Sequence, residues 1–180
     1  DINDSIKKFG YSPNFNVWIK FTIHNSENEP ISKILEFDNS LVTNIALYEN
    51  ELLINKEGLL NKKIDRRTVN PTFLINLDKN ETKTYYMEVY SKKTSLTLKL
   101  NLYSYDDFYS KEILHQIILS LFFFVMIILA LYNLFIYFMI KDISYFYYVA
   151  YIVTLVLHHL LYIGFANLYM FNPLLMEYIV

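Results

Sequence analysis

Residues 113–140 read ILHQIILSLFFFVMIILALYNLFIYFMI, a run of 28 residues without a single Asp, Glu, Lys or Arg. A helix rises about 1.5 Å per residue, so about 20 apolar residues are enough to cross roughly 30 Å of hydrocarbon. A core helix of a soluble domain is rarely apolar on every side over such a length. The run therefore predicts a transmembrane helix, and it divides the chain at about residue 112.

A second membrane segment follows at once. Lys141 and Asp142 make a short polar turn, and the next charged residue is Glu177. That uncharged stretch is too long for one crossing, and Asn172 with Pro173 interrupts it. We therefore predict a second transmembrane helix over residues 143–166 and the start of a third over residues 172–180.

The charged residues gather before the first membrane segment. Of 34 charged residues 31 lie in positions 1–112, where 15 are basic and 16 acidic. This even mixture creates no field that would steer nucleic acid, so we expect no nucleic-acid partner. Cysteine is absent, which excludes disulfides and Cys-based metal sites, and we expect no metal or cofactor. The chain opens at Asp1 without a Met or a cationic leader, so we expect an excised piece of a longer protein.

The part before the membrane alternates like a set of half-buried strands. Residues 15–23 carry apolar side chains at every second position, and after an entry segment over residues 1–13 we predict a β-sandwich over residues 14–104. No helical run appears there, which favours an antiparallel sandwich of jelly-roll or immunoglobulin-like type. Residues 105–112 mix aromatic and charged side chains, as an interfacial connector does. The further predicted strands cover residues 33–37, 42–48, 51–55, 71–77, 85–90 and 96–102.

The orientation of the helices is less clear from charge. Lys92, Lys93, Lys99 and Lys111 outnumber the single Lys141 in the turn, so the positive-inside rule leans toward a cytoplasmic amino terminus. The rule governs short loops, however, and a folded domain of this size is translocated largely regardless of its charge.

The order of several segments is familiar: NVWIKFTIHNSENEP, ILEFDNSLVTNIALYENE, PTFLINLDKNETKTYYMEVYS and LALYNLFIYFMIKDISYFYYVAYIV, with Gly58, Arg66, Arg67 and Gly164 between or after them. The chain resembles, over about residues 14–175, the bacterial seven-transmembrane receptors with diverse intracellular signalling modules (7TMR-DISM), in their second type of extracellular domain and their first membrane helices. The most specific part is Tyr132 and Asn133 followed by the Lys141 turn and residues 145–148.

The resemblance implies a jelly-roll-like sensor domain, similar to carbohydrate-binding modules, in the periplasm. It implies a multi-pass protein of the bacterial inner membrane with residues 1–112 outside, against the lysine count. It also implies seven helices and an intracellular kinase, cyclase or phosphatase output. This sequence ends before a fourth helix and contains no output domain.

No catalytic motif has the right spacing, so we do not expect an enzyme. Trp18 and Lys20 lie on the strand face opposite the apolar row, where an indole could stack a sugar ring or pack in a two-sided sheet. Arg66 and Arg67, with Lys62 and Lys63, form a basic loop that could hold an anionic ligand or face solvent or lipid headgroups.

Three of the polar residues inside the predicted membrane helices are candidates for a role in coupling. His158 and His159 point about 100° apart, so they cannot ligate one metal from one face, and neutral histidines bonded to neighbouring helices are the simpler interpretation. Asn133 is interpreted as an amide that fastens helices together, or as part of a signalling switch.

We therefore predict a membrane receptor fragment that senses a small-molecule or carbohydrate ligand and couples it, through the bilayer-embedded helices, to an intracellular signalling domain. The short connection before residue 113 favours mechanical coupling, and a homodimer is compatible with this prediction. One alternative is a transporter or assembly subunit whose sandwich docks a partner protein by an exposed edge. Another is a membrane-anchored carbohydrate-active enzyme, which would carry a carboxylate pair across a cleft.

Overall fold

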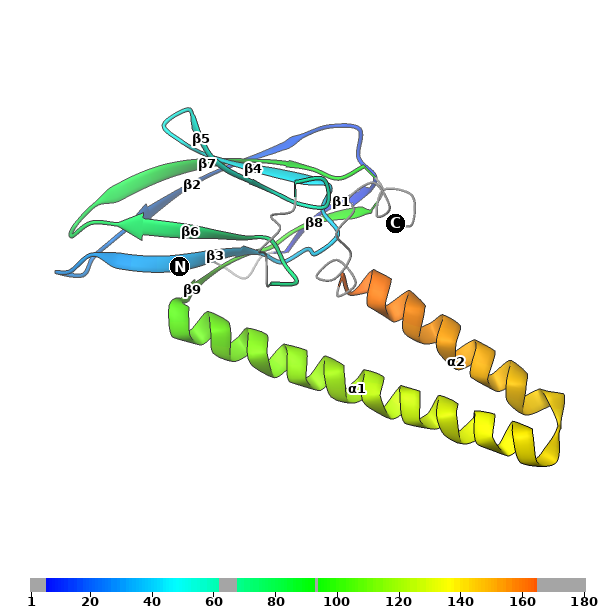
Figure 1. The fold of residues 1–180 in the computed structure, drawn as a ribbon. Coiled ribbons are helices and arrows are strands. Elements are labelled where there is room, and N and C mark those ends of the chain that lie inside the picture. Colours follow the sequence, from blue (N-terminus) through cyan, green and yellow to red (C-terminus); the bar gives the residue numbers. More distant parts are fainter. Residues whose placement is uncertain (1–5, 62–67, 93, 165–180) are drawn as a thin grey trace.

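Two antiparallel sheets face each other at one end of the molecule, and two long helices extend from them (Figure 1). The computed structural model describes residues 6–61, 68–92 and 94–164. The strands are β1 (Lys7–Tyr11), β2 (Val17–His24), β3 (Ile31–Phe37), β4 (Asn44–Glu49), β5 (Leu52–Glu57), β6 (Thr72–Leu77), β7 (Thr82–Tyr90), β8 (Ser95–Leu98) and β9 (Leu100–Ser104), and the helices are α1 (Tyr105–Ile140) and α2 (Ile143–Tyr162). Antiparallel sheets followed by apolar helices confirm the predicted fold class.

The larger sheet has the strand order β2-β7-β4-β5, and the sheet opposite has the order β6-β3-β9. A two-stranded sheet pairs β1 with β8, and β8 runs into β9 through Lys99. The entry segment thus contains strand β1, which has no apolar alternation because its side chains are mostly exposed. The β4–β5 hairpin turns at Asn50 and Glu51, which both have positive φ angles, as tight hairpin turns require.

The core lies between the sheets and contains the alternating apolar side chains of both. Burying such rows provides most of the stability of a sandwich, at about 25 cal/mol per Å² of apolar surface. Leu96 and Leu98 of β8 are buried in this core, and Leu100 and Leu102 of β9 pack against it. The buried core consists of Val17, Leu35, Phe37, Val42, Ile45, Leu47, Phe73, Ile75, Leu77, Tyr85, Met87, Val89, Leu96 and Leu98.

The helices are both long and apolar enough to cross a membrane. Strand β9 leads into α1 without a loop, so residues 105–112 are the first turns of this helix. Lys141 ends α1 in a left-handed conformation, and the Asp142 side chain caps α2 by accepting from the Ser144 N–H. The third helix predicted over residues 172–180 lies outside the described residues.

Candidate functional site

An aromatic patch lies on the outer face of the four-stranded sheet. In the register of β2 against β7, Trp18 is opposite Glu88 and Lys20 is opposite Tyr86. On the other side of β7, strand β4 places Tyr48 opposite Tyr86. Because neighbouring residues opposite one another share a face, these five side chains form one contiguous group, which we call the outer-face patch.

The outer-face patch combines ring surfaces with a fixed carboxylate. The rings of Trp18 and Tyr48 have centroids 5.7 Å apart, and 59% of Trp18 is exposed. The Glu88 carboxylate accepts from Asn16 Nδ2 at 2.6 Å and from the Tyr48 hydroxyl at 3.4 Å. Lys20 Nζ lies 5.5 Å from the centroid of the Tyr86 ring. The patch therefore offers an exposed indole beside a negatively charged acceptor, Glu88, and a positively charged donor, Lys20.

A hollow of about 710 Å³ accompanies this patch, and the turn between β4 and β5 adds Asn50 and Glu51 to its lining. Burial, and then the nearby Glu88 carboxylate, raises the pKa of the Tyr48 phenol. The phenol therefore remains a neutral donor at physiological pH. The size and lining suit a small polar molecule with at least one flat apolar side.

A second feature joins the opposite sheet to the membrane helices. Leu35 and Phe37 of β3 point into the core, so Glu36 between them must point outward, yet it is fully buried. Helix α1 covers it there, and Lys111 Nζ donates to the two Glu36 carboxylate oxygens at 2.5 and 2.8 Å. This contact is an ion pair between a sandwich strand and the first membrane helix.

Two amides complete the surroundings of the Glu36 carboxylate. Asn70 Nδ2 donates to Glu36 at 2.9 Å, and Asn101 Nδ2 of β9 donates at 3.2 Å. A buried carboxylate is costly unless its lone pairs are satisfied, and here three side chains satisfy them. We call Glu36, Lys111, Asn70 and Asn101 the junction cluster.

The first turns of α1 are built to dock on this cluster. Ser104 caps the helix by accepting from the Asp107 N–H, and its hydroxyl donates to the Asp107 carboxylate. Phe108 and Lys111, three residues apart on one helix face, both turn toward the sheet, where Phe108 is buried. Burial lowers the pKa of the Lys111 ammonium, but the hydrogen bond and charge of Glu36 outweigh it, so this pKa lies above its ordinary value.

Glu112, which follows Lys111 directly and lies one turn after Phe108 on α1, is also buried. Its Oε1 atom accepts from the backbone N–H of Val69 at 3.3 Å and from Gln116 Nε2 at 3.0 Å. The loop before β6 is therefore held against α1, next to the junction cluster. Together these contacts hold the three-stranded sheet on the start of the membrane helix.

The sandwich and the helices each match a protein-family model. Residues 2–104 match the family model described as 7TMR-DISM extracellular 2. The chain belongs to the 7TMR-DISM receptors. Residues 115–180 match a second model, described as 7TM diverse intracellular signalling. Neither a curated protein nor a solved structure matches the chain.

Membership of the 7TMR-DISM receptors fixes the orientation. The sandwich is the extracellular domain, and the helices belong to the membrane domain of a multi-pass protein. The lysine count near the first helix pointed to the wrong side, because Lys92 and Lys99 belong to the folded domain rather than to a short loop.

The structure of this 7TMR-DISM chain brings two of the four predicted ligand-binding residues together, since Trp18 and Lys20 both belong to the outer-face patch. Arg66 and Arg67, with the rest of the basic loop, lie outside the described residues. The junction cluster was not anticipated from the sequence. A signal for it exists, because Glu36 is a lone charge inside the apolar strand segment ILEF.

The polar residues of the membrane helices of this 7TMR-DISM chain mostly bond within their own helix. Asn133 is buried, and its Nδ2 atom donates to the Leu129 carbonyl at 2.8 Å. His159 Nδ1 donates to the Leu155 carbonyl at 3.1 Å, and the His159 ring lies 5.9 Å from the ring of Phe122 on α1. Among the described contacts, ring packing rather than a hydrogen bond therefore links His159 to α1.

Proposed function

We propose that the extracellular domain of this receptor binds a carbohydrate on the outer-face patch. The observation that carries this proposal is the exposed Trp18 ring, tilted 32° to Tyr48 beside the fixed Glu88 carboxylate. Sugar rings have apolar C–H faces that stack on aromatic rings and hydroxyls that bond to carboxylates and amines. Lys20, with its ammonium at the edge of the patch, supplies a donor.

The patch is proposed to bind sugar and not to cleave it. Two carboxylates, Glu51 and Glu88, line the hollow, as a glycoside hydrolase would require. Each oxygen of Glu88, however, accepts a hydrogen bond, one from Asn16 and the other from Tyr48. The carboxylate is therefore held as a hydrogen-bond acceptor and not as the proton donor that hydrolysis requires. We therefore expect binding without turnover.

Signal transfer is proposed to run from the sandwich to α1 through the junction cluster. A ligand shifts a receptor only through unequal affinity for two arrangements. The junction cluster joins β3 directly to the first turns of α1. Its contacts would therefore differ between two arrangements of the sandwich and the helices. The intracellular output then depends on the helices that follow.

Trp18 offers a direct test, because it is the only tryptophan in the chain. The purified protein in detergent is titrated with a panel of β-linked glucan, xylan and chitin oligosaccharides while tryptophan emission is recorded. At least one sugar is expected to change the emission. Tyr48→Ala keeps the reporter and removes a stacking neighbour, so affinity should fall about tenfold, which corresponds to about 1.4 kcal/mol.

Thr22→Ala is the matched control for this titration. Thr22 lies on the same face and strand as Trp18, but its hydroxyl contacts Thr84 at 3.1 Å, outside the hollow. The variant should bind sugar as the wild type does. If no sugar in the panel alters the emission, or if Tyr48→Ala and Thr22→Ala behave alike, the carbohydrate proposal is wrong. Release of shorter sugars from a bound oligosaccharide would contradict the absence of turnover.

A second candidate function, docking of a partner protein, is favoured by one observation. Strand β5 is an edge strand, and Leu52, Leu53 and Ile54 are exposed to 74%, 48% and 45%. Exposed apolar edges are places where another chain can add a strand. In the full-length receptor, loss of signalling in Leu52→Lys with intact sugar binding would support partner docking.

A further inference from the structure

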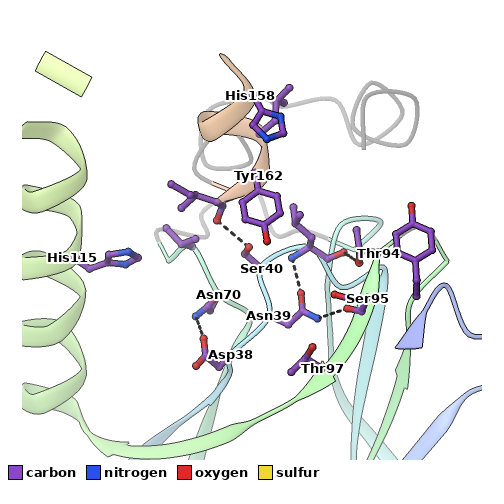
Figure 2. Close-up of a pocket in the computed structure, with 15 residues that line it drawn as sticks. Asp38, Asn39, Ser40, Asn70, Thr94, Ser95, Thr97, His115, His158 and Tyr162 are labelled. Atoms are coloured by element: carbon purple, nitrogen blue, oxygen red, sulfur yellow. Dashed lines mark hydrogen bonds between the residues drawn. The ribbon is translucent and has the colours of Figure 1, made fainter. Parts of the chain in front are cut away.

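A separate cavity of about 840 Å³ lies where the sandwich meets the two helices. The loop that holds Asn39 and Ser40 and strand β8 form its sandwich side, while His115 of α1 and Tyr162 of α2 reach in from the helices (Figure 2). The Ser40 hydroxyl donates to the Ile163 carbonyl at 2.9 Å, which closes the contact between sandwich and α2 beside the cavity. The lining of this cavity shares no residue with the outer-face patch.

The lengths of the helices place this cavity at the membrane surface. Helix α2 has 20 residues and is therefore about 30 Å long, which matches the thickness of the hydrocarbon core. Because α2 begins at the turn on the opposite side, Tyr162 at its end reaches the outer edge of the hydrocarbon. Helix α1 is longer, with 36 residues, and carries His115 beyond that edge. The cavity thus lies at the level of the outer headgroups.

Several polar groups that line the cavity are available to a ligand. Among the described residues, no hydrogen bond is found for the side chains of Thr97, His115, His158 or Tyr162. The His158 and Tyr162 rings stack on each other, with centroids 6.0 Å apart and an interplanar angle of 20°. The imidazoles, the phenol and the hydroxyl are all donors suited to phosphate oxygens.

The charge of the residues that line the cavity determines which phosphate-containing molecules it can bind. No Lys or Arg belongs to the described lining, and its one carboxylate, Asp38, is 3.4 Å from Lys99 outside it. A nearly neutral lining gives little attraction for an anionic lipid, whereas a zwitterionic headgroup matches it. Leu41, Leu161 and Ile163 add an apolar side for the first carbons of the acyl chains.

We propose that this cavity binds the headgroup of a zwitterionic phospholipid of the outer leaflet, with its phosphate hydrogen-bonded by His115 and Tyr162. The lipid would contact the sandwich and both helices at once, so its presence would favour the arrangement in which they are in contact. The proposal rests on the placement of the helices in the membrane and does not depend on carbohydrate binding.

Native mass spectrometry of the detergent-solubilised chain tests this proposal after equilibration with either phosphatidylethanolamine or phosphatidylglycerol. One phosphatidylethanolamine should be retained, and phosphatidylglycerol should be retained several-fold less. Tyr162→Phe and His115→Ala should each lower the retained fraction about fivefold. Tyr151→Phe is the matched control, because Tyr151 is also an exposed phenol on α2 but lies about three turns from Tyr162 and does not line the cavity.

Three results would overturn the proposal. The first is equal retention of the two lipids, which would deny the charge argument. The second is identical behaviour of Tyr162→Phe and Tyr151→Phe, which would place the lipid elsewhere. The third is displacement by glycerophosphoethanolamine, the headgroup without acyl chains, at the same concentration as the lipid, which would identify a soluble ligand instead. None of these results bears on sugar binding, so the two proposals fail separately.

Discussion

At the scale of single residues, Glu36 is the most consequential side chain of the described structure. It is a fully buried carboxylate whose charge is balanced from another element, by Lys111 of α1. Such a pair adds little net stability compared with an apolar pair, but it requires both partners once it is present. The stability of the sandwich therefore depends in part on the docking of α1.

Lys111→Met should leave the Glu36 charge buried with only amide partners. Breaking a buried pair typically costs 3 to 5 kcal/mol, and because Lys111 is partly open to solvent we expect about 2 to 3 kcal/mol. Thermal unfolding of the protein in detergent measures the loss, and Lys99→Met, which removes a surface pair with Asp38, should cost less than 1 kcal/mol. Equal losses in the two variants would contradict the special role of Glu36.

The stability from this pair should also depend on pH. The Lys111 pKa is higher in the folded than in the unfolded protein, so its contribution is complete below the ordinary lysine pKa. It is lost as the pH rises through the raised value. The difference in melting temperature between wild type and Lys111→Met should therefore shrink at strongly alkaline pH.

At the scale of elements, β9 and α1 form one continuous connection between sandwich and membrane. Ser104 ends the strand and caps the helix, and the docking residues Phe108, Lys111 and Glu112 follow within two turns. A movement of the sandwich would displace a continuous helix as one rigid body, whereas a flexible linker would absorb the movement. The connection predicted to be short thus proves to be helical from its first residue.

Inserting Gly-Ser-Gly-Ser after Glu112 should break this rigid connection. Four flexible residues span about 10 to 12 Å on average, so the distance between the sandwich and the cytoplasmic turn should spread by a similar amount. The chain has no cysteine, so spin labels at introduced Lys79→Cys and Lys141→Cys report that distance by pulsed electron resonance. The same insertion after Asn50, in the β4–β5 turn, serves as the control. An unchanged distribution would show that α1 does not set the position of the sandwich.

At the scale of the whole molecule, the sandwich meets the helices at two places. One is the junction cluster on α1, and the other is the contact of Ser40 with the end of α2. Gly164 belongs to the second contact, because a Cβ on it would lie 2.7 Å from Ser40 Cβ. Two separated contacts define the angle of the extracellular domain to the helical hairpin.

Gly164→Ala should open the second contact. Gly10→Ala is a matched control, because both glycines have positive φ angles near +85°. A Cβ added at Gly10 would have no atom within 4 Å, whereas one added at Gly164 would collide with Ser40. Both variants carry a strain of about 1 kcal/mol, but only Gly164→Ala should accelerate hydrogen exchange in residues 38–41. Equal exchange in the two variants would show that the contact with α2 is not closed by Ser40.

Much of this organisation follows from the sequence because it rests on local patterns. Alternation identified the strands from β2 onward, and the absence of charge over residues 113–140 identified the membrane helix. Strand β1 escaped prediction because its side chains are exposed on both faces and carry no apolar period. The charge rule failed on orientation because it counts lysines without regard to folding.

The sequence by itself determined which residues face a core or lipid, because burial of apolar surface leaves a period in the chain. Only the tertiary structure decided which strands are neighbours, and hence that Tyr48, Tyr86 and Glu88 surround Trp18. The same holds for Glu36 and Lys111, which are 75 positions apart and meet only because β9 turns directly into α1. Contacts across sheets and between domains depend on strand order and register, and these are set by the packing of the whole chain.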